Sequence, residues 1–344
     1  MHGLLWKQVL GVGLALPGPY KSDRERRRQA HAQQIKCSEN GSDDISCNRL
    51  VSDYMTLGKP VNLPKTFEDW NVHNEYSLAL DKAAGRCIFL AIGNDGSIAG
   101  VGEAQRFITS SHLSQLQRST GNDDTVPKNM KTTILFLAPG TGLGASYVDS
   151  RGLHLEGDTM NGMEVGHMPA PLHLLGNLRP FSCGCGRDWG CIEAYTSMSG
   201  LPQLIAEFLP QYPSHPFNHE SNAEDSISMK EKCYTLRSLA AEGDQLALKI
   251  FDFQAKALGL QAASLVTALD TEYVIIGGGL MDPESTSKQF RDRYVRVMKE
   301  SMLPYIWPEQ RNKIKVECAK LGELSQSIGA AYMAMNMMKK ARKM

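Results

Sequence analysis

The sequence predicts an α/β protein, and three observations support that prediction. A continuous apolar run at residues 87–92 is typical of a strand that is buried on both faces, and residues 133–137 and 273–276 are further predicted strands. Stretches with apolar residues at helical spacing alternate with these runs, most clearly at residues 245–269. A chain of 344 residues is also too long for one compact core. We therefore expect two lobes built on a mixed or parallel sheet.

The elements can be assigned in chain order. Residues 9–16 are interpreted as a core strand that ends at a Pro-Gly-Pro turn, because the basic region before them is too weak for a secretory signal. Residues 21–58 are polar and lack periodicity, so we expect a long, partly disordered insertion. The remaining expected strands are 87–92, 133–137, 145–148, 273–276 and 313–318, and the expected helices are 74–84, 98–107, 201–208, 228–242, 245–269, 285–302 and 325–340.

Composition and charge narrow the class of protein. Lys and Arg together number 37, as do Asp and Glu, so no net field attracts nucleic acid or an anionic membrane. No apolar run approaches the roughly 20 residues that a membrane span needs. Eight cysteines, three of them clustered, suit a reducing compartment and one metal site. We expect a cytoplasmic protein.

The most informative stretch runs from Glu164 to Glu193. It contains a Cys₃His set with the spacing of a structural zinc site, formed by His167, Cys183, Cys185 and Cys191. Four protein ligands would close the coordination shell, so the metal would stabilise the loop rather than act as a Lewis acid. The alternative is three reduced surface thiols. The two flanking glutamates could each hold neighbouring hydroxyls of a sugar, or they could be exposed loop charges.

Two glycine-rich turns each follow a predicted strand. They span residues 140–144 and 277–279, where the absence of side chains lets backbone N–H groups approach a phosphate. Neither matches the P-loop or a full Gly-x-Gly-x-x-Gly pattern. A hairpin and a strand-to-helix turn without ligand are the alternatives. Together the two turns favour a nucleotide site.

A carboxylate follows another predicted strand. Asp95 stands at the carboxyl end of residues 87–92, which is the usual ligand edge of an open α/β sheet. There it could accept the proton of a hydroxyl that attacks a phosphoryl group, while Asn94 bonds a neighbouring hydroxyl. The alternative is an Asn-Asp-Gly turn with no ligand.

Taken together, these segments resemble the ROK family of sugar kinases, which includes bacterial-type glucokinases and N-acetylmannosamine kinases. The most specific match is Glu164-x-x-His167 with the Cys-x-Cys-Gly…Gly-Cys-x-Glu run that ends at Glu193. Less specific matches are residues 11–19, Asn94-Asp95 with Gly102-Glu103, residues 140–144, residues 276–279, and Leu321-Gly322 with residues 328–331. The resemblance covers nearly all of the chain except residues 20–60.

The resemblance implies an actin-like ATPase, or RNase H-like, fold with two lobes, a cleft between them and a structural zinc loop. The smaller lobe would span residues 1–132 and be completed by the helix at 325–344, and the larger lobe would span residues 133–324. ATP with Mg²⁺ would phosphorylate a hexose, usually at its 6-hydroxyl. Glucose is the expected sugar, and N-acetylmannosamine or N-acetylglucosamine is the alternative. Whether the chain forms a homodimer stays open.

The resemblance also assigns roles to residues. Asp95 would be the general base, and Zn²⁺ would be held by His167, Cys183, Cys185 and Cys191. The sugar would be contacted by Asn94, Asp95, Glu164, His167 and Glu193. The nucleotide would be contacted by Gly140, Thr141, Gly142, Gly144, Gly277, Gly278 and Gly279.

Two features depart from the family pattern. The family's Asp-x-Gly-Gly-Thr segment, which grips phosphates and helps to place Mg²⁺, has no counterpart before Gly11. We therefore expect a shortened N-terminal lobe, and a sugar-binding protein without catalysis is an alternative to the kinase. Between Gly186 and Gly190 the chain has three residues where the family usually has two, which bears on the position of Glu193.

Overall fold

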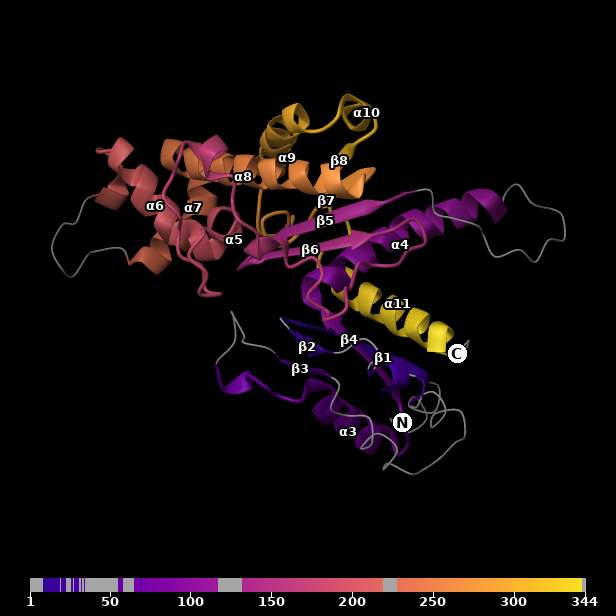
Figure 1. The fold of residues 1–344 in the computed structure, drawn as a ribbon. Helices are drawn as coiled ribbons and strands as arrows, with labels where there is room; N and C mark the ends of the chain where they lie inside the picture. Colours follow the sequence, from indigo (N-terminus) through magenta and orange to yellow (C-terminus); the bar gives the residue numbers. More distant parts are fainter. Residues whose placement is uncertain are drawn as a thin grey trace. The chain divides into compact units, whose positions relative to one another are not determined.

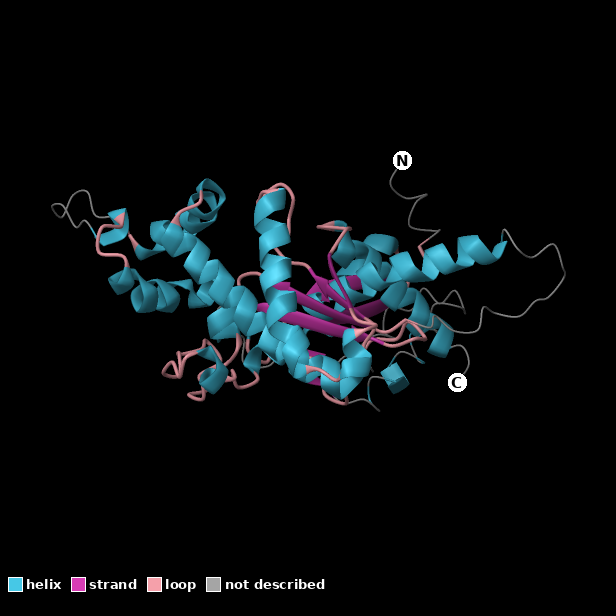
Figure 2. Ribbon diagram, turned by 90° about the horizontal axis from the view of Figure 1, so that it is seen from above, coloured by secondary structure: helices cyan, strands magenta, loops and turns pink. Residues whose placement is uncertain are grey.

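The computed structural model describes residues 9–18, 20–22, 26, 28–30, 32, 34, 55–57, 65–116, 132–218 and 228–341. Helix predominates along the described chain, with short strands between the helices (Figure 2). The chain divides into two compact units. Unit 1 takes residues 1–131, 146–163 and 323–344, and unit 2 takes residues 132–145 and 164–322. Residues 146–163 thus group with unit 1, whereas the sequence placed them in the larger lobe.

Unit 1 is built on two pairs of strands (Figure 1). β1 (Gly11–Leu16) runs parallel to β4 (Phe89–Asn94), and β2 (Tyr20–Ser22) runs antiparallel to β3 (Met55–Leu57). Its described helices are η3 (Lys65–Phe67), α3 (Val72–Ala84), α4 (Asp95–Leu116) and α11 (Leu324–Ala341). Most of the insertion expected at residues 21–58 lies outside the described residues.

The pleat of β4 sorts its side chains between two helical layers. Phe89 and Ala91 pack with residues of α4 and α11, and Leu90 and Ile92 pack with Val72 of α3. This alternation is what a strand buried on both faces requires. The parallel pair β1–β4 therefore forms the middle layer of unit 1.

Small residues let α11 approach β1 and α4 closely. A Cβ at Gly13 of β1 would lie 2.0 Å from the backbone oxygen of Ala330, and a Cβ at Gly329 would lie 1.9 Å from that of Ile98. Both positions exclude any side chain. The close packing fixes the first turns of α4, and hence the residues at the carboxyl end of β4.

A four-stranded sheet has the order β6-β5-β7-β8, and all of it belongs to unit 2 except residues 146–148 of β6. β5 (Ile134–Pro139), β7 (Tyr273–Ile276) and β8 (Lys315–Cys318) are parallel, and β6 (Leu143–Val148) follows β5 through a three-residue turn that only an antiparallel pair allows. The helices are α5 (Glu193–Thr196), α6 (Leu201–Phe208), α7 (Met229–Glu242), α8 (Gln245–Leu269), α9 (Lys288–Met302) and α10 (Pro308–Arg311). Single turns of 3-10 helix are η4 (Val165–His167), η5 (Leu172–Leu175), η6 (Met198–Gly200), η7 (Leu209–Gln211), η8 (Pro216–Asn218) and η9 (Leu303–Tyr305).

Several sequence-predicted elements have the expected bounds, among them α6, α8 and β7. α9 begins later than expected, because Ser285 and Thr286 bond back to Asp282 and Ser287 caps the helix through the N–H of Phe290. Among the described helices, none combines the length and the apolar character that crossing a membrane demands.

A buried histidine makes the stability of unit 1 depend on pH. His73 of α3 is 1% exposed, and its ring contacts the side chains of Gln34 and Ser77. Burial lowers the pKa of His73 from 6.5 to about 4. The unfolded chain therefore binds a proton between these values while the folded chain does not, so the free energy of unfolding falls as the pH falls through this window.

We predict that acidification from pH 7 to pH 4 lowers the free energy of unfolding by up to about 3 kcal/mol through protonation of His73 in the unfolded chain. His73→Leu should flatten this part of the profile of unfolding free energy against pH, measured by denaturant titration. His173→Leu, at an exposed histidine of unit 2, is the control and should leave the profile unchanged. An unaltered slope in His73→Leu would contradict the prediction.

Candidate functional site

Asn94 and Asp95 lie in unit 1 where β4 ends and α4 begins. Both are half-buried. The amide oxygen of Asn94 accepts hydrogen bonds from the N–H groups of Gly96 (3.0 Å) and Ser97 (3.2 Å), so it caps the first turn of α4. The Asn94 oxygen, which the sequence analysis offered to a neighbouring hydroxyl, is therefore engaged in this cap. Capping also holds the backbone of Asp95 at the carboxyl end of the strand.

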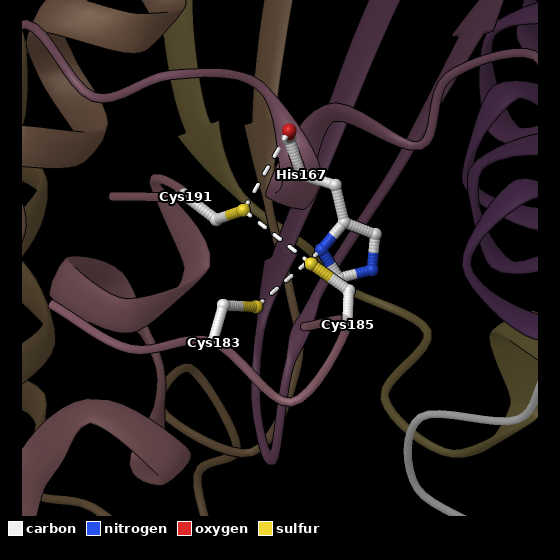
Figure 3. A group of neighbouring side chains, drawn as sticks. All are labelled: His167, Cys183, Cys185 and Cys191. Atoms are coloured by element: carbon white, nitrogen blue, oxygen red, sulfur yellow. Dashed lines mark hydrogen bonds between the residues drawn. The ribbon is translucent and has the colours of Figure 1, made fainter. Parts of the chain in front are cut away.

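The four predicted metal ligands come together in unit 2. One ligand atom from each of His167, Cys183, Cys185 and Cys191 lies within 4.8 Å of the others. Figure 3 shows the three sulfurs and the His167 ring facing one another. The Cys185 and Cys191 sulfurs are 3.6 Å apart, as are Cys183 Sγ and His167 Nδ1. Tetrahedral zinc with Zn–S bonds of about 2.3 Å would place its sulfurs about 3.8 Å apart, so the donor set fits zinc in chemistry and spacing.

Backbone hydrogen bonds form this cluster. The N–H of Ala170 donates to Gly190 O and the N–H of Ile192 donates to Met168 O, which places His167 beside Cys191. Gly186 (φ 80°) and Gly190 (φ 75°) both adopt the left-handed conformation that glycine tolerates best. They flank residues 187–189, the spacer that is one residue longer than the usual family pattern. These three residues form an exposed loop. It ends in Trp189, which is 44% exposed, with Arg187 stacked on its ring.

The thiols of the cluster differ in acidity. Burial raises the pKa of Cys183 and of Cys191. Burial opposes ionisation of Cys185 as well, but hydrogen bonds from the Arg187 backbone and from the other two cysteines outweigh it and lower the pKa of Cys185. A divalent cation among the sulfurs would favour the thiolate at all three.

Glu193 connects the cluster to the first glycine turn. Its side chain is buried, at 6% exposure, and its Oε2 accepts the backbone N–H of Leu143 at 2.9 Å. Its Oε1 lies 3.8 Å from Cys183 Sγ. One carboxylate thus contacts both a metal-type ligand and the turn at residues 140–144. Glu164 is half-buried and precedes η4, and its backbone oxygen accepts the N–H of His167.

The segment after Glu193 supports the same turn. The N–H of Met198 donates to Gly140 O (2.9 Å), and that of Ser199 donates to Thr141 O (3.2 Å). Gln254 of α8 in turn donates to the carbonyl of Ser197. The carbonyl oxygens of Gly140 and Thr141 therefore face the segment at residues 198–199. The Thr141 side chain is exposed.

The second glycine turn lies against the first. β5 and β7 are parallel neighbours, so the turns that follow them meet at one edge of the sheet. A Cβ at Gly278, whose φ is 74°, would lie 2.6 Å from Pro139 O, which immediately precedes the first turn. The two turns that the sequence indicated separately are thus one structural feature.

One cation beside these turns was not singled out by the sequence. Arg237 of α7 is half-buried, and its guanidinium contacts the Met198 sulfur at 3.3 Å. The same group lies 3.8 Å from the position that a Cβ of Gly279 would occupy. An arginine within a helical pattern is usually a solvated residue, so no sequence signal would have found it.

The ROK family profile matches residues 123–337, which is more than half of the chain. The chain belongs to the ROK family. Its fold is shared with a ROK hexokinase from Thermus thermophilus, at a TM-score of 0.58 over 96% of this chain and 80% of that chain, with 21% identity. The predicted α/β fold of actin-like ATPase type is confirmed.

Curated relatives of this ROK chain are sugar kinases. A glucokinase of Halalkalibacterium halodurans is 26% identical over 250 residues, which cover 70% of this chain and 62% of that protein. A glucokinase of Thermotoga maritima is 26% identical over 314 residues, which cover 85% of this chain and 86% of that protein. An N-acetyl-D-glucosamine kinase of Photobacterium profundum is 28% identical over 211 residues, covering 58% of each chain. The chain thus spans less than two thirds of two of these relatives.

The bond between Glu193 and Leu143 yields a prediction. Glu193→Ala would leave the buried N–H of Leu143 without its acceptor, which costs about 1–3 kcal/mol of stability. Glu193→Gln keeps a side-chain oxygen and should lose less. In hydrogen exchange, the peptide that contains Leu143 should exchange faster in Glu193→Ala than in Glu193→Gln.

Glu242→Ala, at an exposed glutamate that ends α7, serves as the control and should change neither the stability nor the exchange. Unchanged protection of Leu143 in Glu193→Ala would show that the bond does not hold the turn.

Proposed function

We propose that this chain is an ATP-dependent hexose kinase, with glucose as its first candidate substrate. The observation that carries the proposal is the meeting of the two glycine turns at the carboxyl ends of β5 and β7. This edge is where open α/β sheets bind ligands, and glycine-rich turns suit phosphate groups. The glucokinases of H. halodurans and T. maritima support the choice of glucose.

In this proposal, the nucleotide phosphates bind to the turn at residues 140–144, and the ribose and base bind near residues 277–279. Mg²⁺ would bridge the β- and γ-phosphates and neutralise charge that develops during transfer. The contribution of the protein is then positioning. The buried carboxylate of Glu193 and the N–H groups of Met198 and Ser199 supply it, because they hold the first turn in place.

Asp95 is the proposed general base. A sugar hydroxyl gives its proton to the Asp95 carboxylate as its oxygen attacks the γ-phosphorus of ATP, and the bond from that phosphorus to the β-bridging oxygen breaks. The products are the sugar phosphate and ADP. Asn94, Glu164, His167 and Glu193 are the proposed sugar contacts. Glu193 would use Oε1, since Oε2 accepts from Leu143.

The metal in this proposal is structural. His167 and the three cysteines would fill all four positions of a tetrahedral zinc ion, which leaves no position for substrate. Zinc would therefore fix the loop from Cys183 to Cys191 and, through Glu193, the glycine turn.

A second candidate substrate is an N-acetylhexosamine. The similarity to the N-acetyl-D-glucosamine kinase of P. profundum supports this alternative.

Purified chain with MgATP should phosphorylate glucose in a coupled assay, with a higher kcat/KM than for N-acetylglucosamine or N-acetylmannosamine. Asp95→Asn should lower kcat by about 10²- to 10⁴-fold because the base is lost, with little change in glucose affinity measured by calorimetry. Asp69→Asn is the matched control. Asp69 is an exposed aspartate of unit 1 at φ 63°, a conformation that asparagine also tolerates.

Equal rates for Asp95→Asn and the wild type would refute the base assignment. Preference for an N-acetylhexosamine would replace glucose as the substrate. Calorimetric binding of a hexose with neither turnover nor ATP binding would replace the kinase with a sugar-binding protein.

For the metal, we expect one zinc per chain by inductively coupled plasma mass spectrometry. Cys185→Ser should lose it and unfold at a lower temperature, whereas Cys318→Ser, outside the cluster, should retain it. Because the ligands must be deprotonated, zinc should be released on acidification. Full zinc occupancy in Cys185→Ser would rule out the four-ligand site.

A further inference from the structure

Helix α8 buries two glutamines in an otherwise apolar surface. Gln254 is 1% exposed and Gln261 is 3% exposed, whereas every other buried residue of α8 is apolar or glycine. The two glutamines are separated by two helical turns, so they lie on the same face of the helix. Burying an amide without a hydrogen-bond partner costs free energy, which an apolar side chain at the same position would avoid. Each amide therefore needs a partner.

Gln254 supports the segment that holds the first glycine turn. Its Nε2 donates to the carbonyl oxygen of Ser197 at 3.0 Å, and this bond is buried. Ser197 is itself fully buried. The two residues that follow Ser197 carry the N–H groups that donate to Gly140 O and Thr141 O. Gln254 thus fixes the start of the short segment from which the turn is held.

Gln261 supports the segments that carry the metal-type ligands. Its Nε2 donates to the Met168 sulfur at 3.3 Å. Met168 directly follows His167, and its backbone oxygen accepts the N–H of Ile192 at 2.9 Å, next to Cys191. A contact that fixes Met168 therefore fixes the place where the two ligand-bearing segments pair. The two glutamines of α8 thus reach two different parts of the same site.

We propose that Gln254 and Gln261 are positioning residues: Gln254 holds the first glycine turn in place for the phosphates of MgATP, and Gln261 holds His167 in place for zinc. This inference rests on the proposed kinase function. Both glutamines act through other residues rather than on substrate or metal. Glu193 joins the two segments to each other, and the glutamines fix each segment to α8. A small displacement of a binding group lowers affinity, so the loss of either amide weakens the binding of one ligand and spares that of the other.

The role of Gln254 is tested by binding of MgATP to the full chain, measured by calorimetry. Gln254→Met keeps a stem of similar length and removes the donor, so MgATP affinity should fall by roughly 10-fold while zinc affinity stays at the wild-type value. Gln254→Glu can donate only when its carboxyl group is protonated, and burial raises the pKa of such a group. Relative to the wild type at the same pH, its MgATP affinity should recover as the pH is lowered from about 8 to about 6. The affinity of Gln254→Met should not recover.

The role of Gln261 is tested by competition for zinc with a chelator. Gln261→Met should weaken zinc binding by roughly 10-fold, because a group behind a ligand-bearing segment is lost. At saturating zinc, its MgATP affinity should match that of the wild type. Gln245→Met, at an exposed glutamine that begins the same helix, is the matched control for both variants and should leave both affinities unchanged.

The outcomes separate this inference from the function on which it rests. A wild type that binds no MgATP overturns the kinase function and the role of Gln254 together. A wild type that binds MgATP, with Gln254→Met binding it equally well, overturns the positioning role alone. Equal losses of zinc and MgATP affinity in one variant also overturn it, because they indicate a general loss of structure.

If the methionine variants do not fold, nuclear magnetic resonance on the wild type decides. The side-chain amide resonances of Gln254 should shift when MgATP binds, and those of Gln261 should shift when zinc binds. Resonances that stay in place would overturn the proposal.

Discussion

The buried carboxylate of Glu193 is the constraint on which the arrangement of unit 2 depends. A charged group at 6% exposure must be hydrogen-bonded, and Leu143 N–H supplies that bond. Glu193 follows Cys191 by two residues and precedes Met198, whose N–H holds Gly140. A single short segment therefore carries a cluster ligand, the anchoring carboxylate and the support of the glycine turn. The cluster and the turn cannot move independently without breaking a buried charged hydrogen bond.

In unit 1 the equivalent constraint is the space left for helix α11. Gly13 and Gly329 have no room for a side chain, and their contacts set the distances between α11, β1 and α4. The Asn94 cap then fixes the turn from β4 into α4. Asp95 is consequently placed by this packing and by its own Oδ1, which accepts the N–H of Gly96 at 2.8 Å, so Oδ2 is the oxygen left for the chemistry proposed for it.

Local patterns in the sequence were sufficient for much of this structure. Residues 245–269 have an apolar stripe bounded by Asp244, which caps α8, and by Asp270 in a left-handed conformation, so both ends of the helix could be predicted. The Cys₃His set was predicted because cysteines so close in sequence must be close in space. The bond from Glu193 to Leu143 spans fifty residues and has no local signature. The role of Asn94 as a cap was one of two chemistries open to the same side chain.

The environment of Arg237 also has no local signature in the sequence. Its position on α7 would suit a solvated arginine, and only the packing of η6 and the loop after β7 around it makes its lack of acceptors visible. Two carboxyl groups lie near it without forming an ion pair among the described residues: Asp282 raises its pKa electrostatically, and Glu284 lines the same cavity as the arginine.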